Sequence, residues 1–203
     1  MIKLKNSVFL HVPKTGGKWV SSILTSPPIN ASVMKGTKNV VVVGHSIHNI
    51  EYDLDKPCFC FVRHPLSWYR SYWSFRWATN TWNRTHNNNL LPMFDMFCKD
   101  HNFATYVDKV ISWNEHNGSV LNSLYGYFTP HCDFIGRQET LQEDLERVLS
   151  LYEGITLKDF PDKKNESPSL VKFNPGQLDK LMKLDRSIID QFNYDYIPDE
   201  FQT

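Results

Sequence analysis

Three short apolar runs constrain the fold of this chain more than any other feature. They are Ser7–His11 (SVFLH), Val40–Val43 (VVVV) and Cys58–Val62 (CFCFV), and each is followed by a turn or a polar segment. Short apolar runs without alternation are typical of strands buried on both faces of a parallel sheet. A fourth strand is expected at Asp133–Ile135, closed by Gly136. The runs therefore predict a sheet whose strands are covered by helices.

Helical patterns lie between and after these runs. We expect helices over Lys18–Thr25, Ser67–Ala78, Met93–Lys99, Phe103–Ser112, Thr140–Leu149 and residues 176–194. Ser67 is expected to cap the second of these helices, and Thr140 with Glu143 to form a capping box at the fifth. The Asn-rich segment 79–91 is expected to be a mobile loop. Strands alternating with helices predict an α/β fold with a mainly parallel central sheet, and 203 residues fit a single domain over 1–203.

The overall composition argues against several classes of protein. Lys plus Arg is 22 and Asp plus Glu is 22, so the net charge is zero and a protein that coats nucleic acid is not expected. No segment approaches the roughly 20 apolar residues of a membrane span, and the N-terminal sequence does not read as a signal peptide. The four cysteines lack CxxC spacing, so we expect reduced thiols and no metal site. We expect a cytoplasmic protein.

The charges are unevenly distributed along the chain. Residues 1–50 contain six lysines and no acidic residue, whereas the remainder carries 16 basic and 22 acidic residues. A mixed surface rarely sorts its charges in this way. The distribution predicts an anion site in the N-terminal quarter.

The segment PKTGGKW, residues 13–19, follows the first predicted strand and precedes the first predicted helix. Two glycines let the backbone N–H groups approach a ligand, the helix N-terminus favours negative charge, and Lys14 and Lys18 add cations. The segment is not a Walker A loop, because Val12 and Trp19 stand where that motif needs Gly and Ser or Thr. It predicts an anion-binding loop; the alternative is a glycine-rich turn with surface lysines.

A second signal follows the third run. Arg63 directly follows CFCFV, and Ser71 lies eight residues later in the next predicted helix. An Arg side chain binds a phosphate through two nitrogens, and a Ser hydroxyl donates to the same group. Two anion-binding elements on neighbouring strands indicate one ligand with two phosphates. The alternative is a structural ion pair for Arg63 and a surface position for Ser71.

Three segments together resemble one protein family. HVPKTGGKWV, FVRHPLSWYRSYW and CDFIGRQETLQEDLERVL are similar to segments of sulfotransferases that use 3′-phosphoadenosine 5′-phosphosulfate (PAPS), nearest to their carbohydrate-type and bacterial members. The resemblance spans residues 7–149. It implies a three-layer fold with P-loop-like nucleotide-binding topology, PAPS as the donor, adenosine 3′,5′-bisphosphate as the product, and no metal. Lys18 stands where Thr is common, and the Lys-Gly-x-x-Gly signature of several cytosolic members is absent.

The resemblance implies a role for each matched residue. Lys14 neutralises charge on the leaving group, and Arg63 with Ser71 holds the 3′-phosphate. The 5′-phosphate is bound by Thr15, Gly16, Gly17 and Lys18. Trp19 stacks on adenine, or packs in the core as the alternative. Arg137 adds a cofactor contact, with a helix-flanking ion pair as its alternative.

Transfer of a sulfuryl group to a hydroxyl also needs a base, and a neutral imidazole is suited to this at pH 7. We predict His45, which follows VVVV and Gly44, with His48 as the second choice. His11 is expected to pack behind the loop, and His64 to be structural. A carboxylate base is the alternative, although the nearest acids, from Glu51 onward, fall in a predicted surface loop.

Residues 68–82 hold seven aromatic side chains, interleaved with Arg70 and Arg76 and followed by Arg84. Aromatic faces suit sugars or apolar acceptors, and the arginines suit an anionic group on the acceptor. The alternative is a helix buried on two sides. We expect a hydroxyl acceptor, with a saccharide favoured over a lipid, a phenol or a peptide tyrosine. Competing functions are a P-loop-related phosphotransferase and a non-catalytic nucleotide-binding module.

Overall fold

The computed structural model describes residues 1–33, 56–79, 91–157 and 171–201. The chain divides into two compact units that alternate in sequence, Met1–Arg63 with Tyr127–Glu166, and His64–Gly126 with Ser167–Thr203. The single domain over 1–203 stays a prediction. The predicted strand at Val40–Val43 and most of the predicted mobile loop, residues 80–90, lie outside the described residues.

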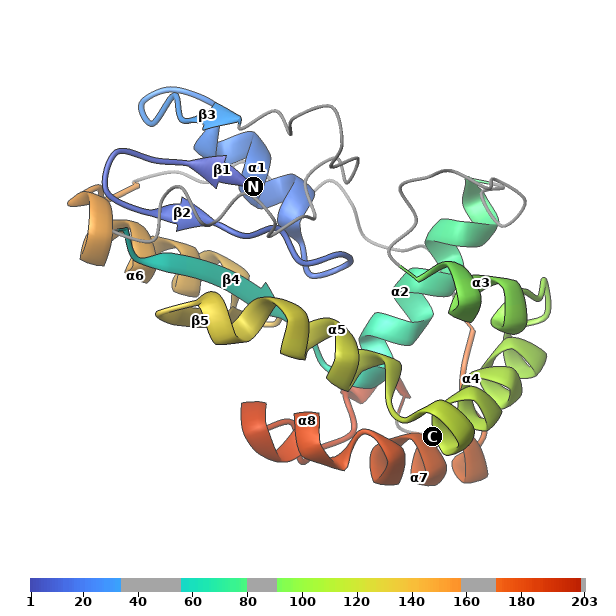
Figure 1. The fold of residues 1–203 in the computed structure, drawn as a ribbon. Helices are drawn as coiled ribbons and strands as arrows, with labels where there is room; N and C mark the ends of the chain where they lie inside the picture. Colours follow the sequence, from blue (N-terminus) through green and yellow to red (C-terminus); the bar gives the residue numbers. More distant parts are fainter. Residues whose placement is uncertain (34–55, 80–90, 158–170, 202–203) are drawn as a thin grey trace. The chain divides into compact units, whose positions relative to one another are not determined.

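The first unit contains a sheet of five strands in the order β3-β1-β2-β4-β5 (Figure 1). The strands are β1 (Ile2–Lys3), β2 (Val8–Phe9), β3 (Ser32–Val33), β4 (Cys58–Val62) and β5 (Phe134–Arg137). β4 runs parallel to both β2 and β5, whereas β1 runs antiparallel to β2 and β3. The α/β class is therefore confirmed, with a mixed sheet in the described residues; a mainly parallel sheet stays a prediction, because Val40–Val43 lies outside them. A tight turn, in which Leu4 N donates to Ser7 O at 2.9 Å, connects β1 to its antiparallel neighbour β2.

Two helices, α1 (Gly17–Leu24) and α6 (Leu141–Glu153), pack on one face of this sheet. Their apolar residues form one core with Phe9, Phe59 and Phe61. The other side of β4 is buried as well, since Cys58 and Cys60 are at most 3% exposed. Burial on both faces explains the unbroken apolar run CFCFV. Both described helices of this unit share one face, so the three-layer arrangement stays a prediction.

The second unit is helical. It contains α2 (Pro65–Ala78), α3 (Pro92–Cys98), α4 (Phe103–Asn117), most of α5 (Val120–Phe128), α7 (Pro175–Leu184) and α8 (Arg186–Phe192). The predicted helices at α2, α3 and α4 are confirmed, and α5 is not predicted. The prediction of a single helix over 176–194 is wrong, because Asp185 separates α7 from α8. The side chain of Asp185 accepts a hydrogen bond from Tyr69, 3.3 Å away on α2, while its backbone carbonyl accepts from the first turn of α8.

Two predicted helix caps are replaced by other contacts. His64, not Ser67, caps α2: its Nδ1 accepts from Leu66 N at 3.2 Å, and its Nε2 lies 2.8 Å from Tyr196 O. The Ser67 hydroxyl instead donates to Glu200 at 3.0 Å. The structural reading of His64 is therefore confirmed. At α6, Thr140 is the N-cap residue, but the capping box does not form because its hydroxyl donates to Asp144.

None of the helices within the described residues has the length and apolar character needed to cross a membrane.

Candidate functional site

Parallel pairing brings the carboxyl ends of β2, β4 and β5 to one edge of the first unit's sheet. Val8 pairs with Cys58, and Val62 pairs with Arg137. The chain leaves this edge through the PKTGG loop after β2, through Arg63 after β4 and through Gln138 after β5. In open α/β sheets, ligands bind at this kind of edge. Three predicted site residues, Lys14, Arg63 and Arg137, therefore belong to one edge.

The PKTGG loop has a special backbone. Lys14 has φ of 67° and Gly16 has φ of 84°, both in the left-handed region. A non-glycine residue in this region is uncommon and is found at functional sites more often than elsewhere. The Gly16 carbonyl accepts from Trp19 N at 2.9 Å and so begins α1. The Thr15 side chain is buried, and its hydroxyl donates to Val12 O at 2.9 Å, which fixes the turn of the loop.

The two glycines suit the loop for different reasons: Gly16 has a left-handed φ of 84°, and Gly17 lies against the His11 ring. A Cβ on Gly16 would lie 2.4 Å from Leu141 Cδ2, and a Cβ on Gly17 would lie 1.9 Å from His11 Cδ2. No side chain fits at such distances without movement. The imidazole of His11 also stacks on Phe9, with ring centroids 6.0 Å apart. The prediction that His11 packs behind the loop is confirmed.

Arg63 joins the loop to the end of β4. Its guanidinium nitrogen Nη1 donates to the carbonyl oxygen of Lys14 at 3.3 Å. The two anion-binding elements predicted separately from the sequence thus meet through a direct contact. On β5, the backbone N–H of Arg137 donates to Asp144 Oδ2 at 2.8 Å, and the Arg137 side chain is half-buried.

The first residues of α1 differ in exposure. Lys18 is exposed beside the helix N-terminus, where a cation can meet an anion. Trp19 is only 7% exposed and belongs to the core cluster with Phe9 and Phe61. A stacked adenine needs an open indole face, so this burial favours the core-packing alternative for Trp19.

Three predicted site residues are not brought to this edge by the described structure. Ser71 is buried on α2 and belongs to the second unit, so its pairing with Arg63 stays a prediction. His45 and His48 lie outside the described residues, and the identity of the base stays a prediction. Among the residues that are described, no group of His, Cys, Asp or Glu is arranged to hold a metal ion.

The aromatic residues of α2 mostly pack inside the second unit. Trp68, Tyr69, Tyr72 and Trp73 are at most 6% exposed, and only Trp77 reaches 48%. Burial, followed by the nearby Asp95 carboxylate, raises the pKa of Tyr72 well above its usual range. The alternative of a helix buried on two sides therefore describes α2 better than an aromatic acceptor cleft.

The two described arginines of α2 are engaged in ion pairs. Arg70 Nη2 lies 2.6 Å from Glu200 Oε1, with its guanidinium over the Phe201 ring. Arg76 pairs with Asp95, which also accepts from Tyr72 at 2.7 Å. These contacts tie α2 to α3 and to the C-terminal segment. They account for Arg70 and Arg76 without an anionic acceptor group.

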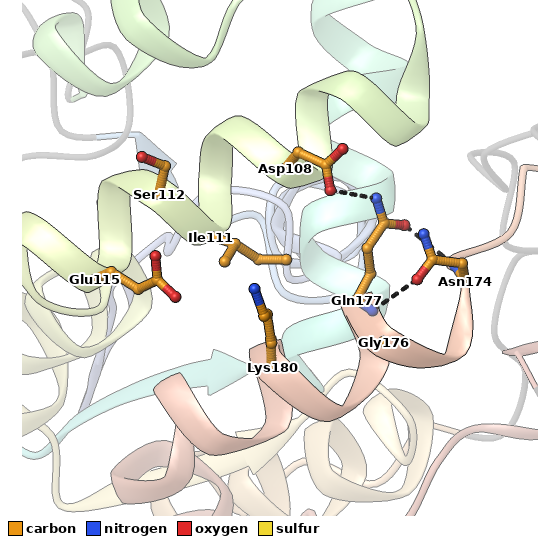
Figure 2. A pocket seen from close by; sticks show the side chains of 8 residues that line it. All are labelled: Asp108, Ile111, Ser112, Glu115, Asn174, Gly176, Gln177 and Lys180. Carbon is orange, nitrogen blue, oxygen red and sulfur yellow. Dashed lines mark hydrogen bonds between the residues drawn. The ribbon is translucent and has the colours of Figure 1, made fainter.

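The second unit also has an open pocket of about 400 Å³ between α4 and α7 (Figure 2). Gln177 closes one end: its amide nitrogen donates to Asp108 at 2.8 Å and to Ala104 O at 3.0 Å. Figure 2 shows Lys180 extending toward Glu115 and Ile111 on α4. The lining carries both Asp108 and Glu115, so its charge does not favour a polyphosphate. These residues belong to none of the motifs that predict a site from the sequence.

Comparison of the chain with protein-family models, with curated proteins and with solved structures found no match.

Proposed function

We propose that this protein is a PAPS-dependent sulfotransferase that transfers a sulfuryl group to a hydroxyl, with a saccharide as the favoured acceptor. The observation that carries the proposal is the hydrogen bond from Arg63 to the carbonyl of Lys14 at 3.3 Å. It joins the two motifs that resemble the family's 5′-phosphate and 3′-phosphate elements. A nucleotide with phosphates at both positions needs two such elements close together.

The geometry of the loop supports a P-loop-like mode of nucleotide binding. Lys14 and Gly16 have left-handed backbone conformations, which are typical of the concave backbone segments that bind anions. The eight-residue helix α1 begins at the end of the loop and adds its positive end. We assign the 5′-phosphosulfate to this loop and the 3′-phosphate to Arg63, with Ser71 as the predicted second donor.

The proposed reaction breaks the bond between the sulfur and the bridging oxygen of the donor and forms one to the acceptor oxygen. Lys14 stabilises the negative charge that develops on the leaving phosphate. His45 accepts the proton of the acceptor hydroxyl. The products are a sulfate ester and adenosine 3′,5′-bisphosphate. The transfer needs no metal in this scheme, because Lys14 and Arg63 supply the positive charge.

Calorimetry tests the nucleotide part of the proposal. Adenosine 3′,5′-bisphosphate is expected to bind with equal affinity with and without Mg²⁺, and more tightly than ATP. Arg63→Ala should weaken this binding, whereas Arg147→Ala, which removes an exposed arginine of the same unit, should not. Binding only of ATP with Mg²⁺ would indicate a phosphotransferase instead. If neither adenosine 3′,5′-bisphosphate nor ATP binds, the proposal is overturned.

The His45→Ala variant tests the chemistry separately from binding. We expect it to bind adenosine 3′,5′-bisphosphate normally and to lose transfer of sulfate from PAPS to an acceptor. His48→Ala is the matched control, since this residue is the second choice for the base. Full transfer by His45→Ala would exclude His45 as the base. Loss of transfer with His48→Ala alone would move the assignment to that residue.

A further inference from the structure

The corner between β5 and α6 packs directly against the PKTGG loop. Leu141, the first residue of α6, is 1% exposed, and its Cδ2 fills the space beside Gly16. The side chain of Gln138 borders the same glycine, and its backbone N–H donates to Val62 O at 2.8 Å. The shape of the loop therefore depends on where this corner holds Leu141.

One carboxylate holds the corner closed. Asp144 Oδ2 accepts from the backbone N–H of Arg137 at 2.8 Å and from the Thr140 hydroxyl at 2.7 Å. These two donors lie at the last residue of β5 and at the N-cap of α6. The same oxygen thus joins the residues on either side of the turn.

The packing around Gly136 shows how close Asp144 comes to β5. A Cβ on Gly136 would lie 2.9 Å from the Cβ of Asp144 and 2.6 Å from the Phe61 ring. The first turn of a helix also favours a negative side chain electrostatically. Asp144 therefore fits this position by shape, by hydrogen bonding and by charge.

Glu143 provides the internal comparison. It occupies the same first turn of α6 and carries the same charge, but its side chain is exposed. An effect of charge at the helix N-terminus should appear at both residues. An effect of holding the corner should appear at Asp144 alone.

We propose that Asp144 is a positioning residue, which fixes the β5–α6 corner so that Leu141 holds the PKTGG loop in its anion-binding shape. The role rests on the proposed function for its consequence in nucleotide binding. Asp144 acts through Leu141 and through the backbone of Arg137, and does not itself contact the nucleotide. A carboxylate beside an anion site is tolerated because both hydrogen bonds direct it into the corner.

The test compares four variants by two measurements. Hydrogen exchange of peptides covering residues 12–20 is measured on the ligand-free protein, and the Kd for adenosine 3′,5′-bisphosphate is measured by calorimetry. Asp144→Ala should speed exchange in the loop and weaken binding about tenfold, the size expected for a modest displacement of binding groups. Asp144→Asn should keep the slow exchange of the wild type and should not weaken binding, because an amide oxygen accepts both hydrogen bonds. Glu143→Ala should also leave both measurements unchanged.

Thr140→Val provides a milder variant that keeps the bond from Arg137, in case Asp144→Ala does not fold. It should change both measurements in the same direction by a smaller factor. Unchanged exchange in Asp144→Ala, or in Thr140→Val where only that variant folds, would overturn the positioning role. If Asp144→Ala speeds exchange in the loop but the wild-type protein does not bind adenosine 3′,5′-bisphosphate, the positioning role is kept and the proposed function is rejected.

Discussion

The residues that stand out in the sequence have different structural roles in the two units. In the first unit, the conspicuous residues are set by backbone geometry: Lys14 and Gly16 are left-handed, and Gly17 has no room for a side chain. In the second unit, the conspicuous aromatic residues of α2 are buried and stacked, with Trp68 and Tyr72 centroids 4.7 Å apart. A motif that needs a particular backbone is thus a better guide to a site than a local excess of one side-chain type.

The comparison has a physical basis. A left-handed backbone costs stability in a residue other than glycine, so the conformation of Lys14 calls for another reason. Large aromatic side chains stabilise a folded unit wherever they are buried, so their clustering needs no ligand. The charged partners differ in the same way. Arg63 contacts a loop carbonyl at the sheet edge, whereas Arg76 is neutralised by Asp95.

The largest expected effect is on the stability of the second unit. Trp68→Ala removes a fully buried indole and should lower the free energy of unfolding by about 3–5 kcal/mol, the range for such cavities. Trp77→Ala is the matched control on the same helix and should change it by only about 0.5–1.5 kcal/mol, because Trp77 is 48% exposed and contacts Trp73 and His101 through its ring. Denaturant unfolding followed by circular dichroism measures both. A similar loss at Trp77 would show that the exposed end of α2 is also a packing surface.

The next effect should be on activity alone. Lys14→Ala is expected to lower the rate of sulfate transfer about 10²–10³-fold, since a positive charge at the leaving group acts mainly in the transition state. The unfolding transition should stay unchanged, because Lys14 is half-buried in a loop and outside the core cluster. Lys5→Ala, an exposed lysine of the same unit, is the control. Release of adenosine 3′,5′-bisphosphate from PAPS with a panel of saccharides gives the rate, and normal release by Lys14→Ala would remove Lys14 from the chemistry.

Long, uniform patterns were predictable from the sequence, and short or long-range features were not. The strand Cys58–Val62 is predicted with its observed bounds, because five consecutive apolar residues indicate a strand that is buried on both faces. β1 and β3 have two residues each, too few for any periodicity. Their antiparallel pairing makes the described part of the sheet mixed. The break at Asp185 depends on partners 66 and 116 residues away, Ser119 and Tyr69, which no local pattern contains.

The candidate site shows the same limit. The PKTGG loop and Arg63 are readable as motifs, because each follows a strand at the edge where ligands bind. The contact between Arg63 and Lys14 depends on strand order, and the support from Asp144 depends on the β5–α6 corner. Trp19 illustrates the reverse case: helical spacing allows it to face either a ligand or the core, and only packing decides.

A smaller effect is expected from adding one methyl group to the loop. Gly17→Ala places a Cβ against the His11 ring and should cost about 1–3 kcal/mol of unfolding free energy, the usual range for overpacking. It should also weaken nucleotide binding, because the ring and the loop must move apart. Gly126→Ala in α5 is the control, since nothing lies within 4 Å of a Cβ there. Alanine should stabilise that helix by up to about 1 kcal/mol. Thermal unfolding of both variants and of the wild type measures these changes. A Gly17→Ala variant as stable as the wild type would show that His11 moves aside at no cost.

The last effect is a gradual one, the dependence of the second unit's stability on pH. Burial raises the pKa of Asp185 from its ordinary 3.8 to about 7, against the opposing hydrogen bonds from Ser119 and Tyr69. Within the described residues, its second oxygen is buried and has no hydrogen-bond partner, and the titratable Tyr69 on α2 lies next to the carboxyl group. Between about pH 4 and 7 the unfolded chain releases this proton while the folded protein keeps it. Stability should therefore fall as the pH rises through this window, by up to about 1.4 kcal/mol per pH unit, and level off above it.

Asp185→Asn separates this titration from that of the other carboxyl groups. The amide keeps an acceptor oxygen for Tyr69 and Ser119 but cannot ionise, so the difference in unfolding free energy between variant and wild type should grow from pH 4 to 7 in favour of the variant. Asp179→Asn, at an exposed position of α7, should leave the wild-type profile unchanged. Parallel pH profiles for Asp185→Asn and the wild type would show that Asp185 ionises with an ordinary pKa. The buried cluster around it would then have to be hydrated, unlike the aromatic packing of α2 beside it.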